Sequence, residues 1–142
     1  MRIHIIMPVL SDKMNDYILN HFDTVASPET ELSISTLKSG TISIESMYDE
    51  EFVARALLEE CIKQERNGVD GIINYCFGNP ATEAAKEILN IPVIGIGEAS
   101  QTIALPFTHN YGIITTVKNS VARNRRKAKL LGTSEKLGAV IP

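Results

Sequence analysis

The chain has 142 residues, of which 44% are hydrophobic and 22% are charged, and its formal net charge is −3. This length supports one full hydrophobic core and excludes two large domains, while the acidic balance argues against non-specific nucleic-acid binding. No apolar stretch approaches the ~20 residues of a membrane helix, and the two cysteines lack metal-ligand spacing. We therefore expect a soluble, cytoplasmic protein that binds neither nucleic acid nor membrane.

The chain is predicted to open with a strand, a helix and a second strand. Residues 2–9 form an apolar, Ile-rich run, which predicts a buried strand. Ser11 is expected to cap a helix over residues 12–21, in which apolar residues recur at helical spacing. Apolar and polar residues alternate over residues 32–36, and this alternation predicts the second strand.

A long helix is predicted over residues 49–67, after a loop over residues 39–48, and Gly68 is expected to end it. From there the pattern is regular. We predict strands over residues 69–75, 91–96, 111–115 and 137–141, and helices over residues 80–89, 98–105 and 117–131. Because apolar strands alternate with helices, the sequence predicts a three-layer α/β fold, a parallel sheet with helices on both faces.

Cys76 is the candidate reactive group, because ligands bind beyond the carboxyl ends of parallel strands and Cys76 follows one. Gly78 allows close backbone approach, Asn79 is expected to cap the next helix, and Pro80 suits its first turn. A thiol near a helix N-terminus has its thiolate stabilised, and free N–H groups there can hold a carboxylate or an imide oxygen. A buried cysteine that acts as a small hydrophobe explains the position equally well.

Other polar residues carry weaker signals. Cys61 lies on the apolar face of the long helix, which is typical of a packed, inert thiol. Thr115 and Thr116 follow a strand, and either bind a ligand or cap the next helix. The basic run over residues 123–129 is interpreted as a solvated helix face. The three histidines have no metal-ligand partner at useful spacing, so we expect no metal site.

Several motifs, in order along nearly the whole chain, resemble the hydantoin and allantoin racemases of the aspartate/glutamate racemase superfamily. They are SIES at 43–46, YDE at 48–50, CFGNP at 76–80, IPVIGIGEA at 91–99 and YGIITT at 111–116. The resemblance implies a fold of two similar lobes with the substrate between them. Residues 1–97 would form the first lobe with Cys76, and residues 98–142 would begin an incomplete second lobe.

The resemblance also implies a racemase that uses no cofactor and no metal. One thiolate removes the proton from the chiral carbon, and a thiol on the opposite face returns one, which is the arrangement that inversion requires. The expected substrate is a hydantoin, a ureide or an amino-acid carboxylate, and a homo-oligomer is expected. The implied site comprises Cys76 as the catalytic thiol and, around the substrate, Pro8, Ser11, Phe77, Gly78, Asn79, Thr115 and Thr116.

This sequence departs from the family pattern at two points. Family members commonly carry Asn-Pro-Asn and a hydroxyl residue after the first strand, whereas here the sequence is MPVLS at 7–11, which retains Pro8 and Ser11. The second cysteine of the longer family members has no counterpart within these residues, so racemisation by this chain is expected to be weak or absent.

Two other functions stay open at this point. A one-thiol enzyme similar to arylmalonate decarboxylase needs only a proton donor, because loss of CO₂ itself creates the carbanion. A non-catalytic module would bind a small anion without any chemistry. A depressed pKa of Cys76 would distinguish an enzyme from a binding module.

Overall fold

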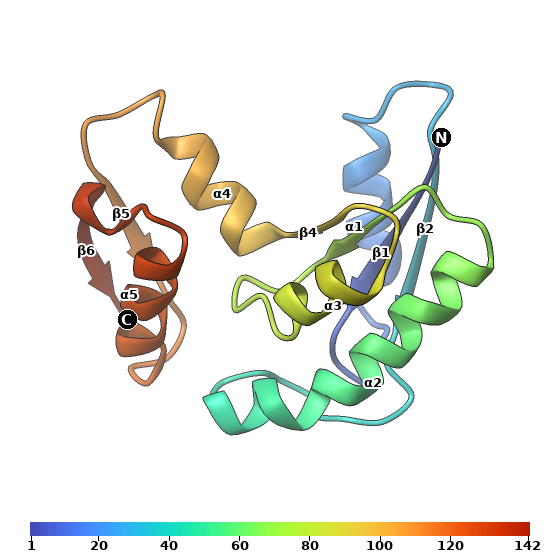
Figure 1. Ribbon diagram of the computed structural model, residues 1–142, viewed down its shortest axis with the longest axis horizontal. Helices are drawn as coiled ribbons and strands as arrows, with labels where there is room; N and C mark the ends of the chain where they lie inside the picture. The colour runs from blue at the N-terminus through green and yellow to red at the C-terminus, as the bar shows by residue number, and fades with distance from the viewer.

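The computed structural model describes all 142 residues and contains two parallel sheets, which α4 connects along the chain (Figure 1). The four-stranded sheet has the order β2-β1-β3-β4, and the two-stranded sheet pairs β5 with β6. The strands are β1 (Arg2–Met7), β2 (Glu31–Thr36), β3 (Gly71–Asn74), β4 (Val93–Gly95), β5 (Tyr111–Ile114) and β6 (Leu137–Ile141). The helices are α1 (Asn15–Asp23), α2 (Met47–Arg66), α3 (Thr82–Ile88), α4 (Ile96–Ala104) and α5 (Ser120–Leu130), with a short 3-10 helix at Ser134–Lys136.

The strand order explains why helices cover both faces of the larger sheet. The chain moves from β1 to β2 in one direction across the sheet, and from β2 to β3 and then β4 in the other. Since parallel crossovers are right-handed, α1 lies on one face, and α2 and α3 lie on the opposite face (Figure 1). The predicted α/β class, with parallel strands between helices, is confirmed.

The main hydrophobic core lies between the larger sheet and the pair α2 and α3. It contains ten buried residues: Ile6, Leu37, Val53, Leu57, Cys61, Val69, Ile72, Ala85, Leu89 and Val93. Alternate strand residues face the other way, and Ile5 is fully buried there. Fully burying an aliphatic side chain of this size contributes about 1.5–3 kcal/mol to stability. The packing of α2 and α3 on the sheet therefore fixes the positions of the strand ends.

All five predicted helix starts lie two or three residues from the observed ones, and three of these corrections have a clear local reason. Ser11 does not cap α1, since the preceding residue is Met14 and no side chain bonds the free N–H groups there. The long helix starts two residues before position 49, because the Ser46 hydroxyl accepts from the Asp49 N–H at 3.2 Å and the Asp49 carboxylate accepts from the Ser46 N–H at 2.8 Å.

The third correction concerns the loop after Cys76. Asn79 and Pro80 do not start the next helix, because Asn79 and Ala81 both have a φ of 49° and α3 begins only at Thr82. The prediction for the end of α2 was right: Gly68 follows it with a φ of 80°, in the left-handed region that glycine favours. None of the helices combines the length and apolar character needed to cross a membrane.

Candidate functional site

A cavity of about 160 Å³ lies between the carboxyl end of β3 and the elements β5 and α5. Cys76, Phe77 and Gly78 line it from one side, and Thr115 and Thr116 line it from the other. The remaining lining residues are Ile44, Ile114, Ser120, Arg123 and Asn124. The two segments that the sequence predicts to share a pocket are thus brought together.

The other predicted site residues lie outside this cavity. Pro8 is fully buried and, like Cys76, stands two positions beyond the registered pair Ile6 and Asn74 of β1 and β3. Pro8 and Ser11 do not line the cavity, and neither does Asn79, although it belongs to the same loop as Cys76. Their proposed contacts with a substrate stay predictions.

Asn74 and Asn79 hold the Cys76 loop in place. Asn74, at the end of β3, is 1% exposed, and its amide donates to the Pro80 carbonyl oxygen and to the Thr82 hydroxyl, both at 2.9 Å. The Asn79 N–H donates to the Cys76 carbonyl oxygen at 2.9 Å, and its side-chain oxygen accepts from the Gly97 N–H at 3.0 Å. Hydrogen bonds therefore connect the loop to both α3 and α4. Asn79 was expected to cap α3, and instead it stabilises the loop through its bond to Gly97.

Two glycines allow the loop to approach its neighbours closely. A β-carbon on Gly97 would collide with the carbonyl oxygen of Phe77, and a β-carbon on Gly78 would collide with the Glu50 carboxylate. Since the Phe77 carbonyl belongs to the backbone, it cannot move without shifting the loop. Gly97 therefore sets the position of the loop that carries Cys76.

Next to the cavity lies a buried cluster of three charged side chains, Glu50 from α2 with Arg123 and Lys127 from α5. Both Glu50 carboxylate oxygens accept from the Lys127 ammonium, at 2.9 and 3.0 Å, and the Arg123 Nε lies 3.4 Å from one of them. The interpretation of residues 123–129 as a solvated face is wrong for these two side chains, which are 8% and 16% exposed. Sequence reasoning missed the cluster, because its acid and its two bases lie on separate helices.

The pKa of the Cys76 thiol is raised above its ordinary value, mainly because the side chain is buried. The Gly78 N–H lowers this pKa by bonding the sulfur, Glu50 raises it, and the Lys127 and Arg123 cations lower it. The expected stabilisation of a Cys76 thiolate by a helix N-terminus is therefore wrong for this structure, in which α3 begins well after Cys76 and burial dominates. The depressed pKa expected of an enzyme rather than a binding module is thus not found. Near neutral pH the group is a thiol, able to donate a proton.

Cys61 is packed, as its place in the sequence suggests. It is 1% exposed on α2, inside the main core, and burial raises its pKa to about 12. A thiol that holds its proton so tightly, away from the cavity, is not available for acid–base chemistry. No group of three or more His, Cys, Asp or Glu side chains is arranged to hold a metal ion.

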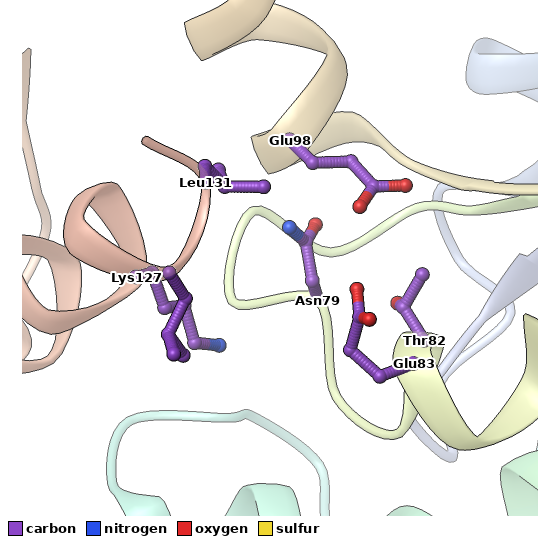
Figure 2. Close-up of a pocket in the computed structure, with 7 residues that line it drawn as sticks. Asn79, Thr82, Glu83, Glu98, Lys127 and Leu131 are labelled. Atoms are coloured by element: carbon purple, nitrogen blue, oxygen red, sulfur yellow. The ribbon is translucent and has the colours of Figure 1, made fainter. Parts of the chain in front are cut away.

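A larger cavity of about 240 Å³ lies beside Asn79 (Figure 2). Figure 2 shows Asn79, Thr82, Glu83 and Glu98 facing Lys127 and Leu131 of the α5 region. Its two carboxylates lie near Lys86: Glu98 accepts from Lys86 at 2.6 Å and from the Gly95 N–H at 3.0 Å, and Glu83 lies 3.6 Å from the same ammonium. Because it contains no thiol, the candidate site is assigned to the smaller cavity that Cys76 lines.

Comparisons with known proteins agree with this fold. Residues 3–142 match the family model described as Asp/Glu/Hydantoin racemase. The hydantoin racemase of Pseudomonas sp. (strain NS671) is 32% identical over 117 residues, 82% of this chain and 47% of the relative. The hydantoin racemase of Rhizobium meliloti is 33% identical over 121 residues, 85% of this chain and 50% of the relative.

Among solved structures, the allantoin racemase from Klebsiella pneumoniae superposes with a TM-score of 0.95 at 32% identity. This match covers 99% of the present chain and 58% of that one. The chain thus spans about half the length of the curated relatives it matches, which is 47% and 50% for the two hydantoin racemases.

Proposed function

The chain belongs to the Asp/Glu/hydantoin racemase family, and on that premise we propose that it supplies one acid–base thiol of a cofactor-independent racemase. The reaction inverts a carbon that carries a hydrogen and lies next to a carbonyl group. The observation that carries this proposal is the cavity between the Cys76 loop and Thr115–Thr116, with Cys76 as the only thiol in its wall. The substrate belongs to the hydantoins, the ureides or the amino-acid carboxylates, and the enzyme is a cytoplasmic homo-oligomer.

Inversion requires proton removal on one face of the carbon and proton return on the other. In one direction a base on the opposite face removes the substrate proton, and Cys76, held as the thiol by its raised pKa, donates its own proton to the carbanion. In the other direction the thiolate form of Cys76 removes the proton. Where no group stands on the opposite face, Cys76 returns a solvent-derived proton to the same face, which gives exchange without inversion. The lost proton leaves an electron pair that spreads onto the neighbouring carbonyl oxygen, where N–H or O–H donors stabilise the charge.

Residues on both sides of the cavity are suited to orient the substrate. The backbone of Phe77 and Gly78 and the hydroxyls of Thr115 and Thr116 line the same space as the thiol. We infer that they bind the carbonyl and nitrogen groups next to the reacting carbon, and that Asn79 acts indirectly by positioning the loop through Gly97. Pro8 and Ser11 would contribute only at the periphery of this site.

The test is hydrogen exchange in D₂O, followed by NMR at the chiral carbon and by optical rotation, on chiral hydantoins, allantoin, aspartate and glutamate. We expect exchange that depends on Cys76, with little racemisation, because the 142 residues place one thiol at the cavity. Loss of positioned proton transfer in Cys76→Ala should slow exchange by about 100-fold or more, whereas Cys61→Ala should leave it unchanged.

Exchange that persists in Cys76→Ala would contradict this proposal, because it would remove Cys76 from the chemistry. Rapid racemisation by the wild-type chain that disappears in Cys76→Ala would keep Cys76 as an acid–base thiol and contradict only the expected weak activity, because a second group on the opposite face would then be in place. Binding of these compounds without any exchange would support a non-catalytic module.

A second candidate, a decarboxylase similar to the arylmalonate enzymes, is favoured by the single thiol in the cavity wall. The C–C bond to the leaving carboxylate breaks, CO₂ departs, and its electron pair stays on carbon. Cys76 then donates its proton to that carbon, which requires the thiol form that burial supports. CO₂ release from an arylmalonate, lost in Cys76→Ala, would identify this activity.

A further inference from the structure

The Arg123 guanidinium, at the wall of the Cys76 cavity, has N–H donors that lack a hydrogen-bond acceptor. It is 8% exposed and lines the cavity together with Cys76, Thr115 and Thr116. Its Nη2 donates to the Ser120 hydroxyl at 2.8 Å, whereas Nε and Nη1 make no hydrogen bond. A guanidinium carries five N–H donors, and burying them without acceptors is costly. Glu50 of α2 forms an ion pair with the Nε at 3.4 Å, but neither α2 nor α5 offers an acceptor to Nη1, so Nη1 is the donor left for a ligand.

The carboxylates near Arg123 are engaged by other donors. Both oxygens of Glu50 accept from Lys127. Asp49, on which the Arg123 charge also acts, accepts from the Ser46 hydroxyl and from the Glu45 and Ser46 N–H groups. Among the residues that line the cavity, Arg123 is the only one with a charged side chain.

We propose that Arg123 binds a carboxylate of the substrate and so makes this site selective for small anionic compounds over uncharged hydantoin rings. This inference rests on the proposed function, because it names the substrate class of the same cavity. A planar guanidinium matches the two oxygens of a carboxylate, and the hydroxyls of Thr115 and Thr116 add donors nearby. A carboxylate held at Arg123 brings its neighbouring carbon into the cavity that Cys76 lines.

The first test compares two alkylating reagents that differ in charge, the anion iodoacetate and the neutral iodoacetamide. In both reactions the Cys76 thiolate displaces iodide from carbon, so the ratio of the two rates cancels the thiolate fraction. Relative to wild type, we expect this ratio to fall about tenfold in Arg123→Gln, as for loss of a charge-assisted hydrogen bond. Arg125→Gln, which removes an exposed arginine from the same helix, should leave the ratio unchanged. An unchanged ratio in Arg123→Gln would overturn the inference.

A second measurement needs no variant and covers the case in which Arg123→Gln fails to fold. Succinate and its neutral analogue succinamide are titrated into the wild-type chain, and the amide signals of residues 76–78 and 115–116 are followed by NMR. We expect succinate to shift them at concentrations about tenfold lower than succinamide. Equal responses would overturn the inference. If succinate is preferred but the chain shows no Cys76-dependent exchange, the racemase proposal is rejected and the anion site is retained. The two proposals can therefore fail separately.

Discussion

Burial raises the pKa of both thiols, but their access to reagents differs. Cys61 lies in the main core, whereas Cys76 lines a cavity. The thiolate is the form that reacts with iodoacetamide. With a pKa of about 12, Cys61 holds a negligible thiolate fraction at mildly alkaline pH. Cys76 is also closer to solvent, so it should be the more reactive thiol.

We therefore expect iodoacetamide to label Cys76 at least about tenfold faster than Cys61 in the folded protein. The rate at Cys76 should keep rising with pH above the ordinary range of a cysteine, because its pKa is raised. Mass mapping of alkylated peptides measures both rates, and labelling in urea, where the two should converge, is the control. Equal or faster labelling of Cys61 in the folded chain would refute this assignment.

At this scale the sequence predicted that Cys76 lies at a cavity beyond a strand end, but not which charged side chains surround it. Cys76 could be found because it follows an apolar strand, and strand ends in parallel sheets collect ligands. Glu50 and Arg123 could not, because each looks like one more surface charge in a helix with many charges. Only the approach of the first turn of α2 to α5 brings Glu50 next to Arg123, and helix positions in the sequence do not encode that approach.

The strands and helices themselves were well predicted from apolar periodicity, and the errors lie at their ends. Ser11 and Asn79 are both good caps by residue type. The Asn79 side chain instead accepts from the Gly97 N–H, on another element. Local cap preferences are worth about 1 kcal/mol, so one tertiary contact of this kind is enough to override them.

Gly97 links α4 to the Cys76 loop, which makes it the sensitive position at the element scale. We expect Gly97→Ala to lower the free energy of unfolding by about 3 kcal/mol, because its β-carbon would overlap the Phe77 carbonyl oxygen. Urea denaturation measures this change. Gly112→Ala is the matched control, since its β-carbon would meet the nearest atom, the Ala139 carbonyl oxygen, at an ordinary 3.6 Å. Similar stabilities for the two variants would show that the loop yields without cost.

At the scale of the whole molecule, the cluster of Glu50, Arg123 and Lys127 connects α2, which packs on the larger sheet, to α5, which packs on the smaller one. Glu50 is 77 residues before Lys127, and their ion pair joins the first turn of α2 to α5. The prediction that residues 1–97 and 98–142 form separate lobes stays a prediction. If it holds, this ion pair contributes to the geometry between them and thus to the width of the cavity.

A double-mutant cycle with Glu50→Gln and Lys127→Gln should give a coupling energy of about 1–2 kcal/mol in the free energy of unfolding. Both side chains are well buried, at 11% and 16% exposed, so solvent screens their attraction only partly. The Arg55 and Glu59 pair, at 90% and 62% exposed, is the control and should give a much smaller coupling. Equal coupling in the two cycles would mean that the buried pair does not hold the elements together.

The place of β1 in the middle of the larger sheet has a consequence for the protein during its synthesis. β1 pairs with β2 from residue 31 and with β3 from residue 71, so it leaves the ribosome long before its second partner exists. At about 5–20 residues per second, the stretch from Met7 to Asn74 takes about 3–13 s to make. Throughout that interval an Ile-rich strand has at least one unpaired edge, which is a template for aggregation. A nascent chain stopped before residue 71 should therefore be the form that binds chaperones most strongly.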